Sequence, residues 1–170
     1  MIAIFSDTHG TDDHGLEGAA LEAAREADVV VHAGDFTTER VLEAFQATCP
    51  TLFAVHGNAD EPAVRDRLPT ERVVAAEGIR IAVRHRHDGG ETGLAMFGRS
   101  RRADVVVTGH THRPAVRDAG DVVVLNPGSH AQPRGNRPGF ATLEAENDAL
   151  EGRLREPDGT VLESFEYESA

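Results

Sequence analysis

The sequence predicts an α/β protein in which two mixed β-sheets pack as a sandwich flanked by helices. Strand and helix patterns alternate in the first two thirds of the chain, as in βαβ units with a parallel sheet. Later they give way to pairs of strands around short turns, as in hairpins. The chain has 170 residues and no repeat or low-complexity linker, which predicts a single domain over residues 1–170.

The first part of the chain predicts three strands and three helices. Apolar residues at helical spacing from Leu16 to Ala24 predict the first helix. Thr37 or Thr38 is a suitable N-cap for the second helix. The predicted strands cover residues 1–5, 28–33 and 51–55, and the predicted helices cover residues 15–26, 37–48 and 61–67.

The remaining sequence predicts one helix, over residues 92–99, and strands that are mostly joined as hairpins. Polar or glycine-containing pairs predict the turns, at Glu77-Gly78, Ala119-Gly120 and Asn147-Asp148. The predicted strands cover residues 72–76, 79–84, 104–108, 115–118, 121–125, 139–145, 149–155 and, as an edge strand, 160–167.

The composition is acidic and free of lysine. There are 29 acidic residues against 17 basic ones, all arginine, for a net charge of −12. Such a surface keeps a protein soluble where salt screens its self-repulsion, so we expect a halophilic protein from a salt-rich cytoplasm. An ordinary solvated surface would also explain the acidic residues, and a GC-rich genome would explain the preference for arginine over lysine. The sequence has no basic stripe, which argues against binding of a nucleic-acid duplex.

The sequence has no pattern typical of a membrane or secreted protein. No apolar run approaches the roughly 20 residues that span a bilayer. The first residues resemble a strand and lack the basic region and cleavage site of a signal peptide. Cys49 is the only cysteine, so the sequence excludes a disulfide framework. We therefore expect a cytoplasmic protein with no membrane partner.

Five predicted strands run directly into residues that bind divalent metals. In an open α/β sheet, ligand sites gather beyond the carboxyl ends of the strands. Asp7 and His9 are two residues apart, so in an extended segment both side chains point the same way. A buried carboxylate such as Asp35 is costly unless it is paired or metal-bound. The candidate metal ligands are Asp7, His9, Asp35, Asn58, His85, His110 and His112.

Each motif has a plainer interpretation when it is taken alone. Residues 7–10 are also typical of a polar loop before a helix, and residues 57–60 of a turn. We expect Asp60 to orient a neighbouring ligand and His32 to be structural, and we expect His56 either to support a ligand or to be structural. The mixture of imidazole, carboxylate and amide ligands favours Mn²⁺, Fe²⁺, Ni²⁺ or Zn²⁺ over Ca²⁺. Their joint placement at strand ends predicts a metal-dependent enzyme.

Together these motifs resemble the calcineurin-like metallophosphoesterase family, and in particular its small YfcE-like phosphodiesterases. The motifs in order are D-x-H at Asp7, G-D at Asp35, G-N-x-D at Asn58, a strand-end His85 and G-H-T-H at His110. The resemblance covers nearly the whole chain and includes the Asn-Pro-Gly-Ser segment at residues 126–129. It implies a metal-dependent phosphoesterase with the αββα sandwich of that family.

The resemblance also implies two divalent metal ions, with Mn²⁺ expected first and Ni²⁺, Fe²⁺ or Zn²⁺ as alternatives. A hydroxide held between the ions is the implied nucleophile, and Asp35 is the implied bridge. One ion is assigned to Asp7, His9, Asp35 and His112, and the other to Asp35, Asn58, His85 and His110. The catalytic residues are expected to be His9, Asp35, Asn58 and His87.

Two positions depart from patterns found in the family. Many relatives carry a histidine that assists the leaving group where this chain has Ala59. The small subfamily also lacks that histidine, so we expect good leaving groups to be favoured, with His9 or His87 as substitute acids. Arg86 stands where the small subfamily has glycine, and it either contacts a phosphate or is simply surface charge.

The leading functional prediction is a phosphodiesterase that acts on a small phosphodiester. A phosphomonoesterase of the same fold is the first alternative. The second is a non-catalytic, metal-binding scaffold for protein contacts, because the retromer scaffold subunit resembles this fold. That subunit has a degraded metal site, whereas all seven ligand positions are present here. The resemblance also suggests a homodimer.

Overall fold

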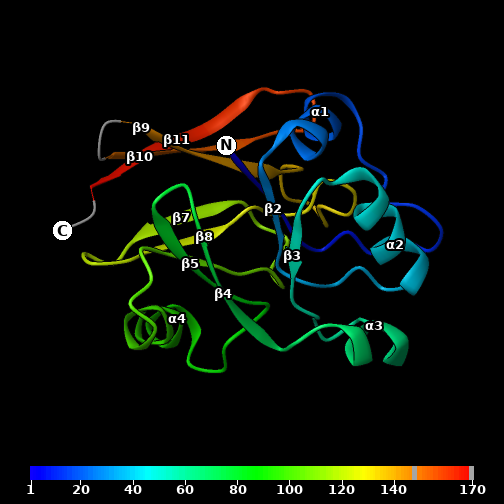
Figure 1. Cartoon of the computed structure of the whole chain (residues 1–170), viewed down its shortest axis with the longest axis horizontal. Helices are drawn as coiled ribbons and strands as arrows, with labels where there is room; N and C mark the ends of the chain where they lie inside the picture. Colours follow the sequence, from blue (N-terminus) through cyan, green and yellow to red (C-terminus); the bar gives the residue numbers. More distant parts are fainter. Residues whose placement is uncertain (147–148, 169–170) are drawn as a thin grey trace.

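The computed structural model describes residues 1–146 and 149–168, which form two facing β-sheets and the helices that cover them (Figure 1). The helices are α1 (Gly18–Glu26), α2 (Glu39–Thr48), α3 (Pro62–Arg67) and α4 (Gly90–Ser100). The strands are β1 (Ile2–Phe5), β2 (Val29–His32), β3 (Leu52–Ala54), β4 (Glu71–Ala76), β5 (Ile79–Arg84), β6 (Val105–Val107), β7 (Ala115–Asp118), β8 (Val123–Asn126), β9 (Phe140–Glu146), β10 (Ala149–Arg155) and β11 (Val161–Glu168).

Both sheets are mixed, as the sequence predicted. The first has the order β11-β10-β9-β1-β2-β3, and the second has the order β4-β5-β6-β8-β7. In the first sheet, β1 pairs in parallel with β2 and antiparallel with β9. In the second, β6 pairs in parallel with β5 and β8, while β4 and β7 are antiparallel edge strands. The predicted edge strand at residues 160–167 is β11.

Alternation along the strands builds three apolar layers. Ile2 and Ile4 face the second sheet and pack in the layer between the sheets, together with Ile81. Ala3 and Phe5 face the other way, into the layer beneath α1 and α2. A third layer joins α4 to the outer face of the second sheet. The helices therefore cover both outer faces of the sandwich, as predicted.

Several element boundaries differ from the predicted ones, for local reasons. Gly15 and Gly18 have φ angles of +63° and +52°, so the chain turns before α1 begins, and residues 15–17 lie outside that helix. The hydroxyl of Thr38 accepts the amide of Val41 at 3.4 Å, which makes Thr38 the N-cap of α2. The turn at Glu77-Gly78 joins β4 to β5. The turn predicted at residues 147–148 lies outside the described residues.

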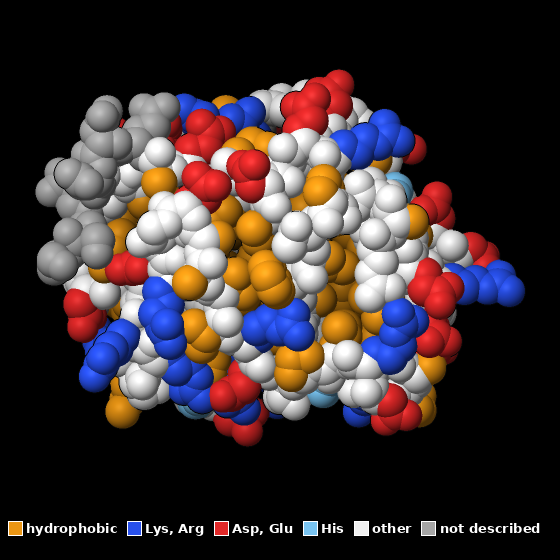
Figure 2. All heavy atoms as spheres, viewed as in Figure 1, with side chains coloured by type: hydrophobic (Ala, Val, Ile, Leu, Met, Phe, Trp, Pro, Cys, Tyr) orange, Lys and Arg blue, Asp and Glu red, His pale blue; other side chains and the backbone are white. Residues whose placement is uncertain are grey.

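Charged side chains of both signs cover the surface. On the face shown in Figure 2, acidic side chains and arginines are interspersed around a central apolar area. Many arginines pair with carboxylates: Nη1 of Arg67 lies 2.9 Å from Oε1 of Glu39, and Nε of Arg99 lies 2.7 Å from Oδ1 of Asp121. Exposed pairs of this kind each contribute little stability. Among the helices in the described part of the chain, none has the length and hydropathy to cross a membrane.

Candidate metal centre

Strand ends from both sheets meet at one edge of the sandwich. The amide of Asp7, after β1, donates to the carbonyl of Gly34, after β2, at 2.9 Å. Nδ1 of His85, after β5, donates to the carbonyl of Ala33 at 2.8 Å and so joins the second sheet to the first. The amide of Gly109, after β6, donates to the carbonyl of His85 at 2.9 Å. These contacts bring the predicted ligands into one place.

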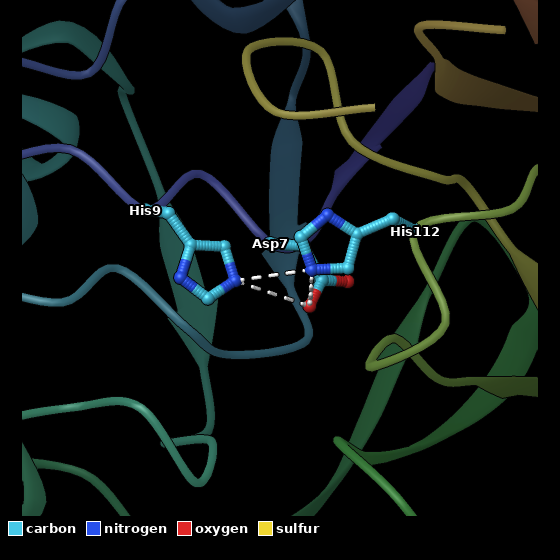
Figure 3. A group of neighbouring side chains, drawn as sticks. All are labelled: Asp7, His9 and His112. Carbon is cyan, nitrogen blue, oxygen red and sulfur yellow. Dashed lines mark hydrogen bonds and ion pairs between the residues drawn. The ribbon is translucent and has the colours of Figure 1, made fainter. Parts of the chain in front are cut away.

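Asp7, His9 and His112 form a first ligand group (Figure 3). Oδ1 of Asp7 lies 3.8 Å from Nε2 of His9 and 3.4 Å from Nε2 of His112. The two Nε2 atoms lie 3.2 Å apart, and the imidazole rings are stacked with centroids 4.8 Å apart. One oxygen and two nitrogens therefore converge on the same small space.

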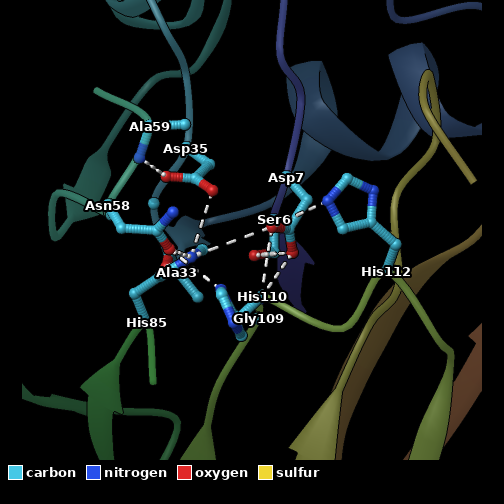
Figure 4. Close-up of polar contacts among 12 residues, drawn as sticks. Ser6, Asp7, Ala33, Asp35, Asn58, Ala59, His85, Gly109, His110 and His112 are labelled. Carbon is cyan, nitrogen blue, oxygen red and sulfur yellow. Dashed lines mark hydrogen bonds and ion pairs between the residues drawn. The ribbon is translucent and has the colours of Figure 1, made fainter. Parts of the chain in front are cut away.

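A second group forms around Asp35 and Asn58 (Figure 4). Oδ2 of Asp35 lies 3.1 Å from Nε2 of His85, and also 3.4 Å from Nε2 of His9 in the first group. Oδ1 of Asn58 lies 3.1 Å from Nε2 of His85 and 2.9 Å from Nδ1 of His110. Asp35 thus lies between the two groups, and all seven predicted ligands are within this cluster.

The backbone at the centre adopts the left-handed conformation, with positive φ angles, which residues other than glycine rarely adopt. Left-handed residues of this kind cost on the order of 1–3 kcal/mol each and occur where the surroundings enforce them, often at functional sites. Five of the seven candidate ligands have positive φ angles, namely Asp7 (+55°), His9 (+47°), Asp35 (+64°), His110 (+72°) and His112 (+58°). Each turns sharply at a strand end, which directs its side chain into the centre.

Asp60 fixes the loop that carries Asp35. Its Oδ2 accepts the amides of Asp35 at 3.0 Å and Gly57 at 2.7 Å, and its Oδ1 accepts the amide of Thr37 at 2.7 Å. Asp60 is 3% exposed, and its carboxylate contacts backbone amides and none of the ligand imidazoles among the described residues. Such contacts support the predicted orienting role of Asp60.

Two glycines leave room for the carboxylates. A Cβ at Gly109 would clash with the hydroxyl of Ser6 and with Oδ2 of Asp7, and a Cβ at Gly57 would clash with Oδ1 of Asp35. The same Ser6 hydroxyl donates to Oδ2 of Asp7 at 2.7 Å. The glycines in the G-H-T-H and G-N-x-D motifs are therefore required by close approach.

Hydrogen bonds also select which nitrogen of each histidine faces the centre. His85 and His112 donate through Nδ1 to the carbonyls of Ala33 and Gln132. A carbonyl can only accept, so in each neutral ring Nδ1 carries the proton and Nε2 keeps its lone pair. Backbone partners of this kind orient metal-binding imidazoles in proteins. Both Nε2 atoms point at the carboxylates.

The pKa values of Asp35 and His85 are shifted in opposite directions because the two side chains lie close together in the centre. Burial opposes ionisation of Asp35, but the hydrogen bond and charge of His85, with the amide of Ala59, lower its pKa to about 2. Burial also opposes the charge of His85, yet its hydrogen bond with Asp35 and the nearby Asp7 raise its pKa. A divalent cation would replace the proton of His85 as the partner of these carboxylates. The donor set therefore fits divalent metal ions.

The structure keeps three other histidines outside the ligand cluster. His32 is buried, accepts the amide of Gly34 through Nδ1 at 3.1 Å and stacks on Phe36. His56 hydrogen-bonds with Thr70 at 3.2 Å. His87 accepts the amide of Gly89 through Nδ1 at 3.0 Å, and it lines a cavity that also reaches the ligand His110. The structural role expected for His32 and the structural alternative for His56 agree with these contacts.

Sequence reasoning missed the roles of the last residue of β8 and of the loop that follows it. The hydroxyl of Ser129 donates to the carbonyl of Asp7 at 2.6 Å, and the side-chain amide of Asn126 donates to the carbonyl of Gly109 at 2.9 Å. The carbonyl of Gln132 orients His112. The only sequence observation that pointed to this segment was the resemblance of residues 126–129 to a family segment. That resemblance did not indicate which groups these residues contact.

Comparisons with known proteins show the family to which the chain belongs. Residues 1–148 match the model of the calcineurin-like phosphoesterase superfamily domain. The chain belongs to this superfamily. A probable metallophosphoesterase from Methanothermobacter thermautotrophicus is 30% identical over 171 residues, covering 98% of each chain. The phosphodiesterase YfcE of Escherichia coli is 29% identical over 121 residues, covering 68% of this chain and 63% of the relative.

Solved structures share the fold of this phosphoesterase. Vps29 from Chaetomium thermophilum superposes with a TM-score of 0.82 at 18% identity, covering 99% of this chain and 98% of that one. At this identity the likeness concerns the fold alone. The predicted αββα sandwich of the family is confirmed.

Proposed function

We propose that this phosphoesterase is a phosphodiesterase that uses two divalent metal ions to hydrolyse a small phosphodiester. The observation that carries the proposal is the position of Asp35, whose Oδ2 faces His85 of one ligand group at 3.1 Å and His9 of the other at 3.4 Å. The similarity to the Escherichia coli phosphodiesterase supports a diester as substrate.

The proposed ligands form two sets, one for each ion, which share Asp35. Asp7, His9, Asp35 and His112 would hold one ion, and Asp35, Asn58, His85 and His110 the other. Oδ1 of Asp35 accepts the amide of Ala59 at 2.8 Å, while Oδ2 faces His9 and His85, so we propose that Asp35 would join the two ions. Two such ions lower the pKa of a water nucleophile and stabilise charge on the phosphoryl oxygens.

The centre has few groups that could protonate the leaving group. Ala59 has no acidic group, so His9 and His87 remain the proposed catalytic donors. Because Nδ1 of His87 accepts the amide of Gly89 at 3.0 Å, the neutral ring carries its proton on Nε2, as a donor requires. We therefore propose that substrates with good leaving groups react fastest.

A pair of chromogenic substrates tests the function. Protein loaded with Mn²⁺ would be assayed with bis(4-nitrophenyl) phosphate and with 4-nitrophenyl phosphate. A higher kcat/KM for the diester supports the phosphodiesterase, and a higher value for the monoester favours the phosphomonoesterase. Metal binding without hydrolysis of either compound favours the interaction scaffold. Asp121→Asn, which changes an exposed carboxylate paired with Arg99, is the matched control for variants of Asp35.

Four further expectations remain proposals. We propose Mn²⁺ as the resident metal, a cytoplasmic location, a salt-rich environment and a homodimer. The net charge of −12 and the absence of lysine support the salt-rich environment. Thermal melts from low to multimolar KCl test it: a melting temperature that rises with salt agrees, and a salt-independent one contradicts it.

A further inference from the structure

Two cavities adjoin the proposed metal centre. One has a volume of about 430 Å³ and reaches His110. The other has a volume of about 340 Å³ and reaches Asn58 and His85. Nδ1 of His110 and Oδ1 of Asn58 lie 2.9 Å apart, so the cavities meet at ligands of the same proposed ion. Each has the size of a small-ligand pocket, for which about 300–1,000 Å³ is usual.

The cavity at His110, named here the apolar cleft, lies between α4, β7 and β8. Leu94 of α4, Ala115 of β7 and Val124 of β8 give it an apolar floor. Arg113 and Arg117 lie at its border. The guanidinium of Arg113 has no hydrogen-bond or ion-pair partner among the described residues, whereas Arg117 pairs with Glu91 at 3.2 Å. Glu91 also lines the cavity, so the free cation in the described part of this lining is the guanidinium of Arg113, and apolar side chains beside it suit a flat ring next to an anionic group.

The cavity at Asn58, named here the polar cleft, has a different lining. It is bordered by polar and charged side chains and one glycine, and among its described lining residues there is no aliphatic or aromatic hydrocarbon side chain. Arg84 and Thr70 are among these residues. Arg86 borders both clefts and pairs with Asp88 at 2.9 Å. A ring placed here would meet no hydrocarbon side chain among these lining residues, in contrast to Leu94, Ala115 and Val124 in the apolar cleft.

We infer that the substrate is an asymmetric phosphodiester, with a ring-bearing apolar arm in the apolar cleft and a hydroxylated or otherwise polar arm in the polar cleft. The inference rests on the proposed function, because it takes the scissile phosphate to bind at the metal centre. A diester has two arms on either side of its phosphate. The two clefts meet at Asn58 and His110, and one has apolar side chains in its lining while the other has polar ones, so each cleft suits a different arm. Leu94, Ala115 and Val124 are then specificity-determining residues.

Binding of two non-hydrolysable anions tests the apolar cleft without turnover. Phenylphosphonate and methylphosphonate both carry the phosphonate group and differ in the ring. Titration calorimetry with Mn²⁺-loaded protein is expected to give at least about tenfold tighter binding of phenylphosphonate, because the ring buries apolar surface. Equal affinities for the two anions, or no binding of either, would overturn the inference.

A bulky side chain in the cleft should remove that preference. Ala115→Phe is expected to lower the ratio of phenylphosphonate to methylphosphonate affinity by about tenfold. Ala119→Phe makes the same change beyond β7, at a half-buried alanine outside the lining of the cleft, and should keep the ratio. If both variants keep it, the ring binds elsewhere and the inference is wrong. The wild-type comparison decides the matter even if Ala115→Phe fails to fold.

The polar arm is tested by turnover. The 4-nitrophenyl ester of glycerol phosphate has one ring and one hydroxylated arm, whereas bis(4-nitrophenyl) phosphate has two rings. Both release 4-nitrophenol, so KM compares the second arms. The mixed diester should have the lower KM, and an equal or higher KM would contradict the asymmetry. Failure to hydrolyse either diester, with the phosphonate preference intact, would count against the proposed function and not against the cleft.

Discussion

His85 and His112 face the metal centre, whereas His32 and His130 pack among phenylalanines beneath α1 and α2, although all four side chains are buried. The first two donate through Nδ1 to backbone carbonyls and present Nε2 to carboxylates. In the second two the proton is on Nε2. His32 accepts a backbone amide through Nδ1, and His130 donates through Nε2 to the carbonyl of His14 at 2.8 Å.

His85 also differs from His32 and His130 in protonation. Burial lowers the pKa of His32 far below its usual value and that of His130 to about 4. At His85 burial is the largest single influence and acts in the same direction, but the hydrogen bond with Asp35 and the charges of Asp7 and Asp35 together outweigh it, and the pKa is raised. Burial of a histidine therefore does not distinguish a ligand from a structural residue. The carboxylates that face it, and the ring nitrogen left free, make the distinction.

The comparison predicts its largest effect at His85. His85→Gln removes the nitrogen that faces Asp35 and Asn58, so kcat/KM for bis(4-nitrophenyl) phosphate should fall on the order of a thousandfold. Calorimetric titration with Mn²⁺ should show the loss of one ion per chain. His14→Gln, at a half-buried histidine outside the cluster, is the control and should keep both ions. Full metal binding by His85→Gln would show that His85 is no ligand.

Acid should destabilise the protein through His130. Burial lowers the pKa of His130 from its usual value of 6.5 to about 4 in the folded protein. Between pH 4 and pH 6.5 the unfolded chain therefore binds more protons than the folded one. The free energy of unfolding should therefore be fully retained above pH 6.5 and fall by up to about 3 kcal/mol as the pH drops to 4. Urea unfolding of metal-free protein at a series of pH values measures this. His130→Leu should lessen the slope over that pH range, where His32 also contributes; an unchanged slope would contradict the assignment.

Replacement of His32 should reduce stability and spare the metals. His32→Leu leaves the amide of Gly34 and the hydroxyl of Thr8 without their buried partner. The free energy of unfolding should fall by about 2 kcal/mol. The number of Mn²⁺ ions bound per chain should stay the same. A variant of normal stability that binds fewer ions would place His32 in the metal centre and break the comparison.

The smallest effect is expected at Asp60, which acts on the centre only through the backbone. Asp60→Asn keeps one acceptor oxygen for the three amides that the carboxylate now accepts. Loss of a group that orients ligands lowers metal affinity by roughly 10–100-fold, and the lower end of that range is expected here. Asp66→Asn, at an exposed carboxylate of α3 outside both clefts, is the control. A drop in kcat with unchanged metal affinity would indicate a different role.

The fold and the cluster of ligands followed from the sequence because both depend on local patterns. Apolar alternation marks the strands, and polar residues mark their ends, so the convergence of Asp7, Asp35 and His85 needed only the rule for strand ends. The resemblance of the motifs assigned the rest. The prediction of a single domain stays a prediction, which the apolar layer shared by the two sheets supports.

Other features depend on contacts between distant segments. Ser129 reaches the carbonyl of Asp7 across more than a hundred residues, and no spacing in the sequence signals that bond. The left-handed backbone at Asp7 and His110 is likewise imposed by the surroundings, because neither residue type prefers it strongly enough to predict it. The roles of His9 and His87 as proton donors stay predictions.

Electron paramagnetic resonance of Mn²⁺-loaded protein tests the central claim most directly. If Asp35 joins two ligand groups, two ions bind per chain close together, and their spins should couple. We predict two Mn²⁺ ions per chain with a spin-coupled spectrum, which Asp35→Asn converts to that of isolated Mn²⁺. A wild-type spectrum of isolated Mn²⁺ at saturating metal, or one ion per chain, would contradict the two-ion centre.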